Sequence, residues 1–547
     1  MKKSIFYTFG LALAAIAFAS CDDFLDKMPD SRAELDTEEK VVKMLVSAYP
    51  DNTYNMCAEF SSDNVDDYGS IKSYNQLQEE LYNWQEVSSV ETNENPNAVW
   101  GDAYTAIAAA NQALAAIEEL GGAKTAKLQA AKGEALICRA YAHWVLVNMF
   151  CMHYNTNHPD DLGVPYMEHA ETELNPKYSR GTVAGVYEKM IEDIETGIPL
   201  IDDAIYSAPK YHFNYKAACC FASRYYLFMQ DWGNAIKYAT MALTSNPSSL
   251  LRDYSAIAAL PKGTSRHQEY VNSASTANFL LQAATSNSGL LFDWYSTAGR
   301  YSHGKLQGIY ETVQPKKGGP WGSSVTFKAP HAVLASSGKY VLPRTWRVFQ
   351  YTDPVAGTGF NKAISVLFTS EEALLNRAEA YIMKMNEDPT ALDKALEDIN
   401  LYAANLFSAG FKSMTEASII KWATETYPDY SELYVGKTSV SSPQTLNPKK
   451  KLHAAPYNTL EEGGPQESML QALIFMRRYQ FLHEGMRWFD TRRFGITVYR
   501  YLLDEDAETV VQITDQISDE NGTADPRRAL QLPADVIAAG LTPNPRK

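Results

Sequence analysis

The sequence predicts a mainly α-helical fold, in which antiparallel helix pairs resembling tetratricopeptide repeats stack into a superhelix with long irregular loops. Three observations support this class. Apolar residues recur at intervals of three or four in several long segments. Residues 222–247 follow the spacing of a tetratricopeptide repeat. Between residues 279 and 351 the helical period disappears and glycine and proline are frequent.

The first predicted helices occupy residues 41–50 and 100–120, and another follows at about 124–150. Gly121 and Gly122 separate the last two, which are therefore expected to pack as a helical hairpin. Thr182 is the expected N-cap of the next amphipathic helix. The apolar face of the segment 100–120 is formed by Trp100, Tyr104, Ile107, Ala108, Leu114 and Ile117.

The repeat-like match at 222–247 places small residues where two antiparallel helices must touch. It is carried by Ala222, Tyr225, Asp231, Trp232, Ala235, Ile236, Tyr238, Ala239, Ala242, Leu243, Asn246 and Pro247. A weaker match to the same repeat covers residues 374–399. Just before it, Thr369 and Glu372 are the expected capping box. Taken alone, such repeats also suit a scaffold that binds only other proteins.

Aromatic residues are concentrated in the irregular stretch 279–351. Flat rings on loops suit carbohydrate, whose C–H faces stack on a ring while its hydroxyls bind neighbouring polar groups. The alternative is that individual rings pin the loops to the helical body. The candidate ligand-binding residues are Trp84, Trp294, Tyr295, Trp321 and Trp346. A second loop-rich segment, Pro428–Pro465, carries Lys449, Lys450 and Lys451, for which the pattern predicts a solvated turn.

The first twenty residues have the layout of a secretory signal peptide, because Lys2 and Lys3 precede an apolar run that ends in small residues. That run is shorter than the ~20 residues of a transmembrane helix. Phe18-Ala19-Ser20-Cys21 resembles the bacterial lipobox, which implies cleavage after residue 20 and lipidation of Cys21. An ordinary cleaved signal is the alternative. Asp22 and Asp23 resemble a surface-export signal of Gram-negative lipoproteins.

Charge and motif content exclude several function classes. The 547-residue chain carries 65 acidic and 49 basic residues, a net charge of −16, so a nucleic-acid partner is not expected. No metal or cofactor site is predicted, since Cys57, Cys138, Cys151, Cys219 and Cys220 lack zinc-type spacing. Cys138 and Cys219 are expected to be core thiols.

Catalytic motifs are also missing from the sequence, which contains no H-E-x-x-H, G-x-S-x-G or G-x-G-x-x-G. Asp293 and Glu311 are the only acidic residues between Ala283 and Tyr351, so the aromatic loops offer no obvious pair of carboxylates for glycoside hydrolysis. No catalytic residue is therefore assigned, and the chain is expected not to be an enzyme.

The run from Arg477 to Asp490, RRYQFLHEGMRWFD, resembles the signature E-R-x-x-E-L-x-x-E-G-x-R-W-x-D-L of the SusD/RagB family of outer-membrane nutrient-binding lipoproteins. Arg477 and Gln480 replace glutamates of that signature. The matching residues are Glu484, Gly485, Arg487, Trp488 and Asp490. Further similar pieces follow in the family's order: Cys21 to Asp26, Ala113-Leu114, Arg139-Ala140-Tyr141, Gly163-Val164-Pro165, Arg180 to Val183, Asn376 to Tyr381 and Leu530 to Pro533.

The resemblance implies a SusD-like fold, with a helical N-terminal region at 21–275 and a C-terminal region at 276–547 that includes a few short strands. It implies a lipid-anchored outer-membrane protein that captures oligosaccharide or polysaccharide and passes it to a SusC-like TonB-dependent barrel. Cargo derived from peptide or protein is the alternative. Glu484, Arg487, Trp488 and Asp490 are expected to be structural. The acidic composition favours a neutral glycan.

Overall fold

The computed structural model describes residues 35–546, apart from 70–72, 90–92, 173–175, 293–298, 316, 324, 335–337, 409, 437–445 and 520–522. The predicted signal peptide and Cys21 lie outside the described residues. Among the helices of the described part, none is both long enough and apolar enough to cross a bilayer.

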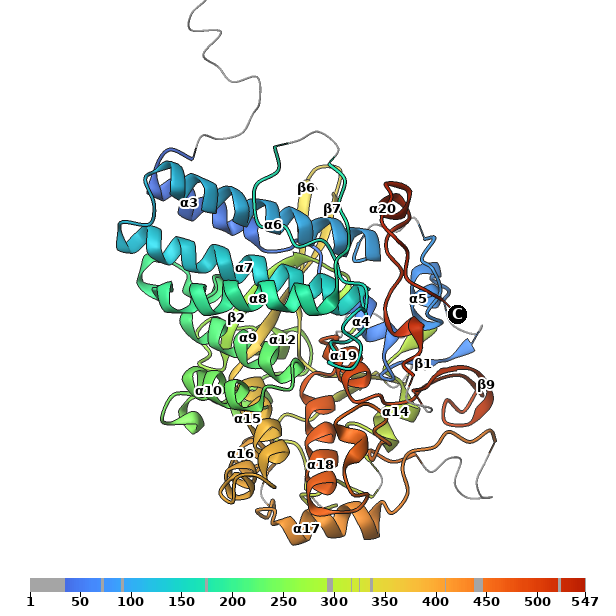
Figure 1. The fold of residues 1–547 in the computed structure, drawn as a ribbon. Coiled ribbons are helices and arrows are strands. Elements are labelled where there is room, and N and C mark those ends of the chain that lie inside the picture. Colours follow the sequence, from blue (N-terminus) through green and yellow to red (C-terminus); the bar gives the residue numbers. More distant parts are fainter. Residues whose placement is uncertain are drawn as a thin grey trace, which may run out of the picture.

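Antiparallel helices form the first layer of the molecule (Figure 1). They are α3 (Glu38–Met44), α6 (Pro96–Glu119), α7 (Ala126–Phe150) and α8 (Val183–Gly197). Asn95, Thr125 and Thr182 cap α6, α7 and α8, each accepting a backbone N–H with its side chain, as the sequence predicted for Thr182. The long helices α6 and α7 pack as the predicted hairpin.

The second layer continues the pairing and confirms the repeat-like interpretation. Helix α9 (Tyr215–Phe228) packs on α10 (Trp232–Leu243), and α15 (Ser370–Lys384) packs on both α10 and α16 (Ala391–Leu406). Thr369 caps α15 through the N–H of Glu372. Helix α15 also packs on α18 (Pro465–Gln480), and α19 (Met486–Arg493) packs on α4 (Asn55–Ser61).

A three-stranded antiparallel sheet lies within and after the stretch predicted as loops. Its order is β2 (Asn278–Thr285), β7 (Thr358–Thr369) and β6 (Trp346–Asp353). The family resemblance implied only short strands, whereas β7 has 12 residues. Its large apolar side chains at Phe360, Ile364, Val366 and Phe368 share the even positions of the strand, where only Lys362 interrupts them, and this is the strand period rather than the helical one.

The remaining elements are short. The paired strands are β1 (Asp66–Asp67) with β3 (Tyr301–Ser302), β4 (Ala332–Leu334) with β5 (Lys339–Val341), and β8 (Val498–Leu503) with β9 (Val510–Ile517). The short α-helices are α5 (Gln76–Tyr82), α11 (Tyr254–Ala259), α12 (Thr264–Tyr270), α13 (Ser288–Leu291), α14 (Lys305–Tyr310), α17 (Glu416–Lys421) and α20 (Ala534–Ala538). A 3₁₀ turn, Leu45–Ala48, follows α3.

The core is centred on aromatic rings from distant parts of the chain. Trp144 of α7 contacts Tyr54, Phe228 and Phe489, with ring centroids 5.2 to 6.2 Å apart. These contacts join α7, α9 and α19. The five cysteines of the described part are buried free thiols, which confirms the prediction for Cys138 and Cys219.

The prediction of a solvated lysine turn is wrong for two of its three residues. Lys449 and Lys450 are buried, and the Lys450 ammonium lies 2.6 Å from the Glu311 carboxylate. A run of like charges usually faces solvent, but here a buried acid from a distant loop makes burial of one ammonium possible. Only Lys451 follows the predicted pattern, pairing with Glu462 at the surface.

Gly485 is required by both conformation and space. It precedes α19 with a φ of 75°, and an added Cβ would lie 3.1 Å from the Cβ of Ala58 and 3.2 Å from the backbone of Asn55. We expect Gly485→Ala to lower the free energy of unfolding by about 1–3 kcal/mol. Gly357→Ala is the matched control, since its φ is 68° and nothing lies near its Cβ position. If urea unfolding shows an equal loss of unfolding free energy in the two variants, the contacts with α4 contribute nothing.

Candidate functional site

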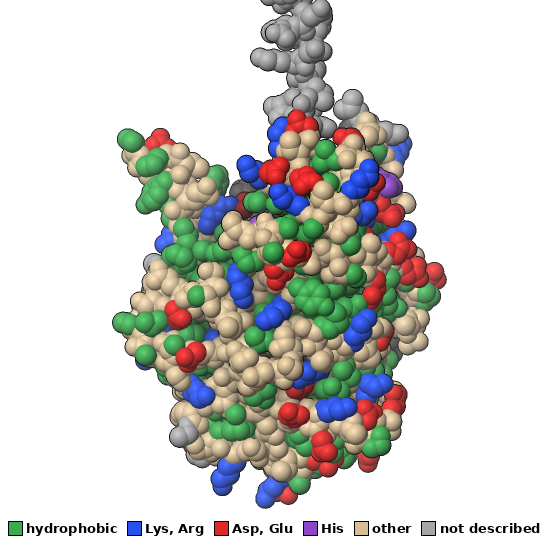
Figure 2. Space-filling model, turned by 90° about the vertical axis from the view of Figure 1, so that its left-hand side faces the viewer, with side chains coloured by type: hydrophobic (Ala, Val, Ile, Leu, Met, Phe, Trp, Pro, Cys, Tyr) green, Lys and Arg blue, Asp and Glu red, His purple; other side chains and the backbone are tan. Residues whose placement is uncertain are grey.

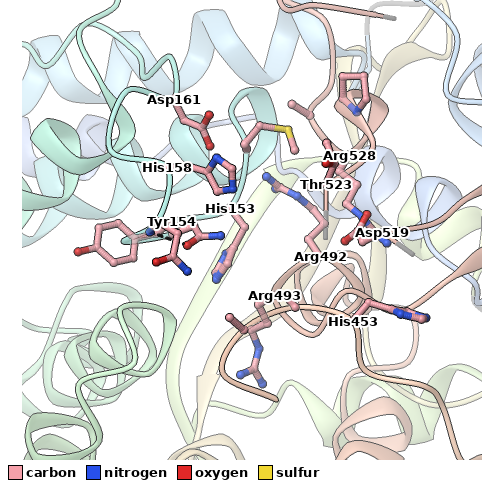
Figure 3. Close-up of a pocket in the computed structure, with 18 of the residues that line it drawn as sticks. His153, Tyr154, His158, Asp161, His453, Arg492, Arg493, Asp519, Thr523 and Arg528 are labelled. Atoms are coloured by element: carbon pink, nitrogen blue, oxygen red, sulfur yellow. Dashed lines mark hydrogen bonds and ion pairs between the residues drawn. The ribbon is translucent and has the colours of Figure 1, made fainter. Parts of the chain in front are cut away.

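A cleft of about 400 Å³ opens between the loop that follows α7 and the C-terminal part of the chain (Figure 3). Residues 152–161 line one side, and residues 453–458, Asp519 and residues 523–529 line the other. Arg492 and Arg493, at the end of α19, lie between the two sides. The volume falls in the range of small-ligand pockets, roughly 300–1,000 Å³.

Local turns hold the loop after α7 in place. Asn155 accepts the N–H of Asn157 with its side chain at 2.9 Å, and its carbonyl accepts the N–H of His158 at 3.0 Å. The carbonyl of Asp161 accepts the N–H of Val183 at 2.8 Å, which ties the loop to the start of α8. Backbone groups therefore fix this loop, and several of its side chains face the cleft.

The lining combines groups that donate and accept hydrogen bonds. Amides, imidazoles, carboxylates and a phenol are represented by Asn155, Asn157, Asn458, His153, His158, His453, Asp161, Asp519 and Tyr154. Burial, together with the nearby Arg492 and Arg493, lowers the pKa of His153 well below its usual value. His153 is therefore a neutral imidazole at pH 7, with one donor and one acceptor nitrogen. Such a lining matches the hydroxyl groups of a sugar.

The arginines between the two sides of the cleft are bound to other groups of the same chain. Arg492 is 3% exposed and donates to the carbonyls of Asn148 and Cys151, at the end of α7. Burial lowers the pKa of Arg492 to about 10, so the guanidinium remains charged and complements the negative end of the helix dipole. Arg528 binds Asp519 at 2.7 Å. These contacts set the position of the cleft walls.

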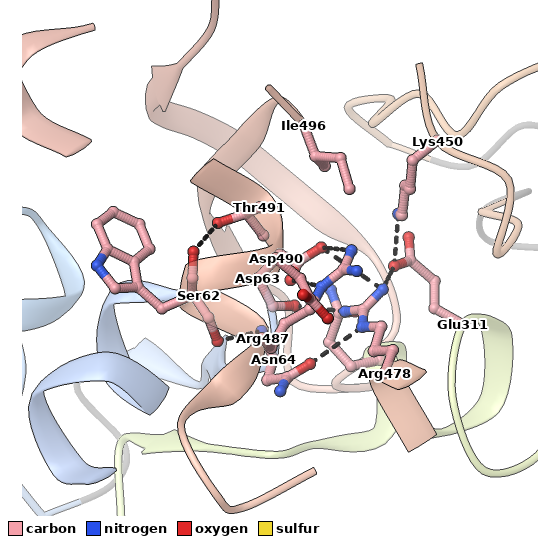
Figure 4. A network of polar contacts seen from close by, with 12 residues as sticks. Ser62, Asp63, Asn64, Glu311, Lys450, Arg478, Arg487, Asp490, Thr491 and Ile496 are labelled. Carbon is pink, nitrogen blue, oxygen red and sulfur yellow. Dashed lines mark hydrogen bonds and ion pairs between the residues drawn. The ribbon is translucent and has the colours of Figure 1, made fainter. Parts of the chain in front are cut away.

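The terminal signature lies in a buried ionic network rather than in the cleft (Figure 4). Arg487 of α19 makes two hydrogen bonds of 2.7 Å to Asp63, which lies 424 positions away in the sequence. Arg478 of α18 contacts Glu311, whose carboxylate also binds Lys450 at 2.6 Å. Burial alone would raise the pKa of Asp63, but Arg478 and Arg487 hold it well below its usual value.

The other signature residues are equally enclosed. Asp490 lies 3.1 Å from Arg477 and 2.8 Å from Arg493, and these cations outweigh burial and lower its pKa to about 2. Burial raises the pKa of Glu484 to about 7, and its carboxylate accepts the Tyr270 hydroxyl at 3.1 Å. Trp488 is fully buried. Glu484, Arg487, Trp488 and Asp490 therefore join helices and loops that are distant in sequence.

Two of the aromatic residues predicted to bind ligand, Trp84 and Trp321, are buried. Trp84 is 4% exposed, donates its indole N–H to the Ser61 carbonyl at 2.9 Å, and has the Arg500 guanidinium 3.9 Å from its ring. Trp321 is 8% exposed and packs on Phe407, with ring centroids 4.3 Å apart. The expectation of open stacking faces is wrong for these two rings, because both are packed in the core.

Trp346 lies half-buried on β6 against the core, and Trp294 and Tyr295 lie outside the described residues. Glycine and proline identify a loop but do not show which of its rings turn inward.

The residues that line the cleft were not predicted from the sequence. Their only sequence signal is the density of hydrogen-bonding side chains in residues 153–161, directly after a long helix. Nothing in that run indicates the distant segments 453–458 and 523–529 or Asp519.

A metal site finds no support in the part of the chain that the structure describes. No group of three or more His, Cys, Asp or Glu residues there has an arrangement that could hold a metal ion. The polar side chains that line the cleft offer hydrogen bonds to a ligand.

Comparison with known families matches residues 23–227 to the SusD-like family described as "Starch-binding associating with outer membrane". None of the curated proteins compared with the chain matches it.

Solved structures extend the similarity of fold over most of the chain. A SusD superfamily protein from Bacteroides thetaiotaomicron is 17% identical, with a TM-score of 0.58 over 94% of this chain and 100% of that one. A putative sugar-binding protein from Bacteroides vulgatus is 18% identical, with a TM-score of 0.58 over 94% and 99%. A laminarin-binding SusD-like protein is 15% identical, with a TM-score of 0.51 over 93% and 98%. These structures share the fold of this chain.

Proposed function

We propose that this chain, which is SusD-like in its fold and in the sequence of its N-terminal region, is a non-catalytic glycan-binding protein of the cell surface. The match of residues 23–227 to the SusD-like family carries the proposal, because that family is described as starch-binding and associated with the outer membrane. One structural neighbour is described as laminarin-binding and another as a putative sugar-binding protein.

Lipid anchoring and delivery complete the proposal. The lipobox-like sequence before Cys21 supports attachment of the mature chain to the outer membrane through acyl chains. A protein held there passes its cargo to a transporter for uptake into the cell. A SusC-like TonB-dependent barrel is the partner that the family resemblance implies, and the captured oligosaccharide or polysaccharide passes to it.

The cleft between residues 152–161 and the C-terminal segments is the proposed glycan site. Its side chains offer both donors and acceptors, whereas its arginines are already bound to protein groups. A neutral glycan therefore suits it better than a strongly anionic one. Trp294 and Tyr295 remain predicted ligand contacts from the sequence, and the half-buried Trp346 remains a further one.

Binding without hydrolysis fits the carboxylates of this cleft. A glycoside hydrolase needs one carboxyl group as acid and a second as base or nucleophile. Asp519, one of the two acids that line the cleft among the described residues, is held 2.7 Å from the Arg528 guanidinium. A carboxylate paired in this way is a poor proton donor, because the cation stabilises its ionised form.

The test is affinity electrophoresis of the protein through gels containing starch, laminarin or an acidic polysaccharide, with reducing ends assayed on the same samples. We expect a neutral glycan to retard the protein without release of reducing ends. His153→Ala combined with Asn157→Ala is expected to weaken binding roughly 10- to 100-fold, since each lost hydrogen bond contributes about 1 kcal/mol.

His169→Ala combined with Asn97→Ala is the matched control, because these residues are exposed and do not line the cleft. Equal binding by the two double variants would remove the cleft from the proposal. Release of reducing ends would contradict the non-catalytic function. If no polysaccharide retards the protein, peptide cargo or a purely protein partner becomes the better explanation.

A further inference from the structure

The β6–β7 hairpin extends beyond the sheet as a free arm. The third strand, β2, ends at Thr285, which pairs with Lys362, and past this point β6 and β7 pair only with each other. About six further residues reach the turn, a length of roughly 20 Å. Residues 350–358 are all exposed. Figure 2 shows an arm of this kind projecting from the body at the upper left.

Large apolar side chains cover this arm and are exposed. Val355 at the turn is 99% exposed, and Tyr351 and Phe360 are 58% and 52% exposed. The ring of Phe349 lies 4.8 Å from that of Tyr351. Hydrophobic side chains gather on the projecting arm in Figure 2. Exposed apolar surface of this kind marks an interaction site, because moving each apolar side chain out of water lowers the free energy.

The distribution of these side chains argues against a flat protein partner. Phe349 and Tyr351 share one face of the hairpin, because they are two positions apart on β6. Phe360 pairs with Gln350 and therefore lies on the opposite face. Val355 occupies the end. A flat partner would cover only one face, whereas a lipid surface can surround both faces and the end.

Charge along the arm also favours a lipid surface. Between Tyr351 and Phe360 the only charged residue is Asp353, whose carboxylate accepts the N–H groups of Val355 and Ala356 at 2.9 and 3.0 Å. The cations Arg347 and Lys362 lie at the base. Insertion must remain shallow, because β6 is an edge strand whose free backbone groups cannot enter hydrocarbon. Tyrosine at position 351 suits the headgroup region.

The arm lies at the end of the molecule that an anchor at Cys21 would hold near the membrane. Helix α3, close to the first described residue, lies at the same end as the free part of β6 and β7 (Figure 1). Asp51, shortly after α3, binds Lys362 at 2.6 Å and accepts the N–H of Thr285 at 2.6 Å. The ~14 residues from Cys21 to Leu35 span at most about 50 Å.

We propose that the tip of the β6–β7 hairpin inserts into the outer leaflet of the membrane to which the chain is anchored, as a second point of attachment. This inference rests on the proposed anchoring at Cys21. Two attachment points would fix the orientation of the body relative to the membrane, whereas a lipid at the end of a linker would leave it free to rotate.

The test places a photoreactive phenylalanine derivative at position 355 of the full-length chain in Gram-negative cells that process lipoproteins. The matched control carries the same group at Val511 on β9, an exposed apolar position at 43%. After irradiation, membranes are isolated and adducts are identified by mass spectrometry. We expect at least about fivefold more lipid adduct at position 355 than at position 511, because apolar burial drives insertion.

The outcomes separate the arm from the anchor. Protein adducts without lipid adducts at position 355, or equal lipid adducts at both positions, would overturn the insertion while leaving the anchoring intact. Loss of the wild-type chain from the membrane fraction would overturn the anchoring and the insertion with it. Replacing both Tyr351 and Val355 with serine should also reduce lipid adducts formed by a probe at Phe360 at least about threefold.

Discussion

Replacing Asp63 with alanine is expected to lower the free energy of unfolding by about 3–5 kcal/mol, the usual cost of breaking a buried ion pair. Asp63 accepts two hydrogen bonds of 2.7 Å from Arg487 and lies 3.6 Å from Arg478. Both guanidinium groups are buried, so the truncation leaves Arg487 without its carboxylate. Arg478 keeps Glu311, which limits the loss to one principal pair.

Urea unfolding followed by circular dichroism measures this effect. Asp36→Ala is the matched control, since Asp36 and Lys40 form an ion pair of 2.6 Å with both side chains about half exposed. That control should change the stability far less, because exposed ion pairs contribute little. Adding Arg487→Met to Asp63→Ala should recover part of the stability, because it removes the unpaired buried charge. A double variant that is as unstable as the single one would contradict this explanation.

The paired helices could be predicted from the sequence because their information is local. Apolar residues three and four apart define the buried face of α6, whereas α7 is buried on all sides from Gly133 to Phe150. Thr182 marks the start of α8 through its own side chain. The resemblance of Arg477–Asp490 to a family signature then pointed to the whole fold. The solved structures confirm that fold across at least 93% of this chain in the three cases described.

Features that depend on partners distant in sequence could not be predicted. Lys450 is buried because Glu311 meets it, and these residues are 139 positions apart. Arg487 and Asp63 are farther apart still. The cleft follows the same principle, since residues 152–161 face segments about 300 and more positions later. Periodicity identifies which face of an element is buried, but not which side chain of another element it meets.

Three buried carboxyl groups are expected to lower the stability progressively as the pH rises from about 4.5 to above 7, because they favour protonation in the folded state. Burial raises the pKa values of Glu59, Asp66 and Glu484 to about 7 each, against usual values near 4. Their contribution to stability is fully present below the pKa of the unfolded state. It is lost as the pH rises through the pKa of the folded state. Each contributes on the order of 3 kcal/mol over this range.

The lowered pKa values of Asp63 and Asp490 act in the opposite direction. Their stabilisation is present above about pH 4 and is lost as the pH falls through the folded pKa, which for Asp490 is about 2. Burial also lowers the pKa values of His143 and His303 to about 3 and those of His153 and His483 well below the usual value. These neutral imidazoles lose their stabilisation as the pH falls below about 6.5, so they oppose the three carboxyl groups over the same range. Thermal unfolding midpoints measured from pH 3 to pH 9 give this profile directly.

Self-repulsion by a net charge of −16 would also reduce stability at high pH. A variant is therefore needed that separates the effect of the buried carboxyl groups from the effect of the net charge. Glu484→Gln keeps an acceptor for the Tyr270 hydroxyl but cannot ionise, and it should flatten the decline between pH 5 and pH 8. The exposed Glu119→Gln removes the same charge from the surface of α6 and should leave the slope almost unchanged. Equal flattening by the two variants would assign the decline to net charge, since only the position of the removed carboxyl group differs between them.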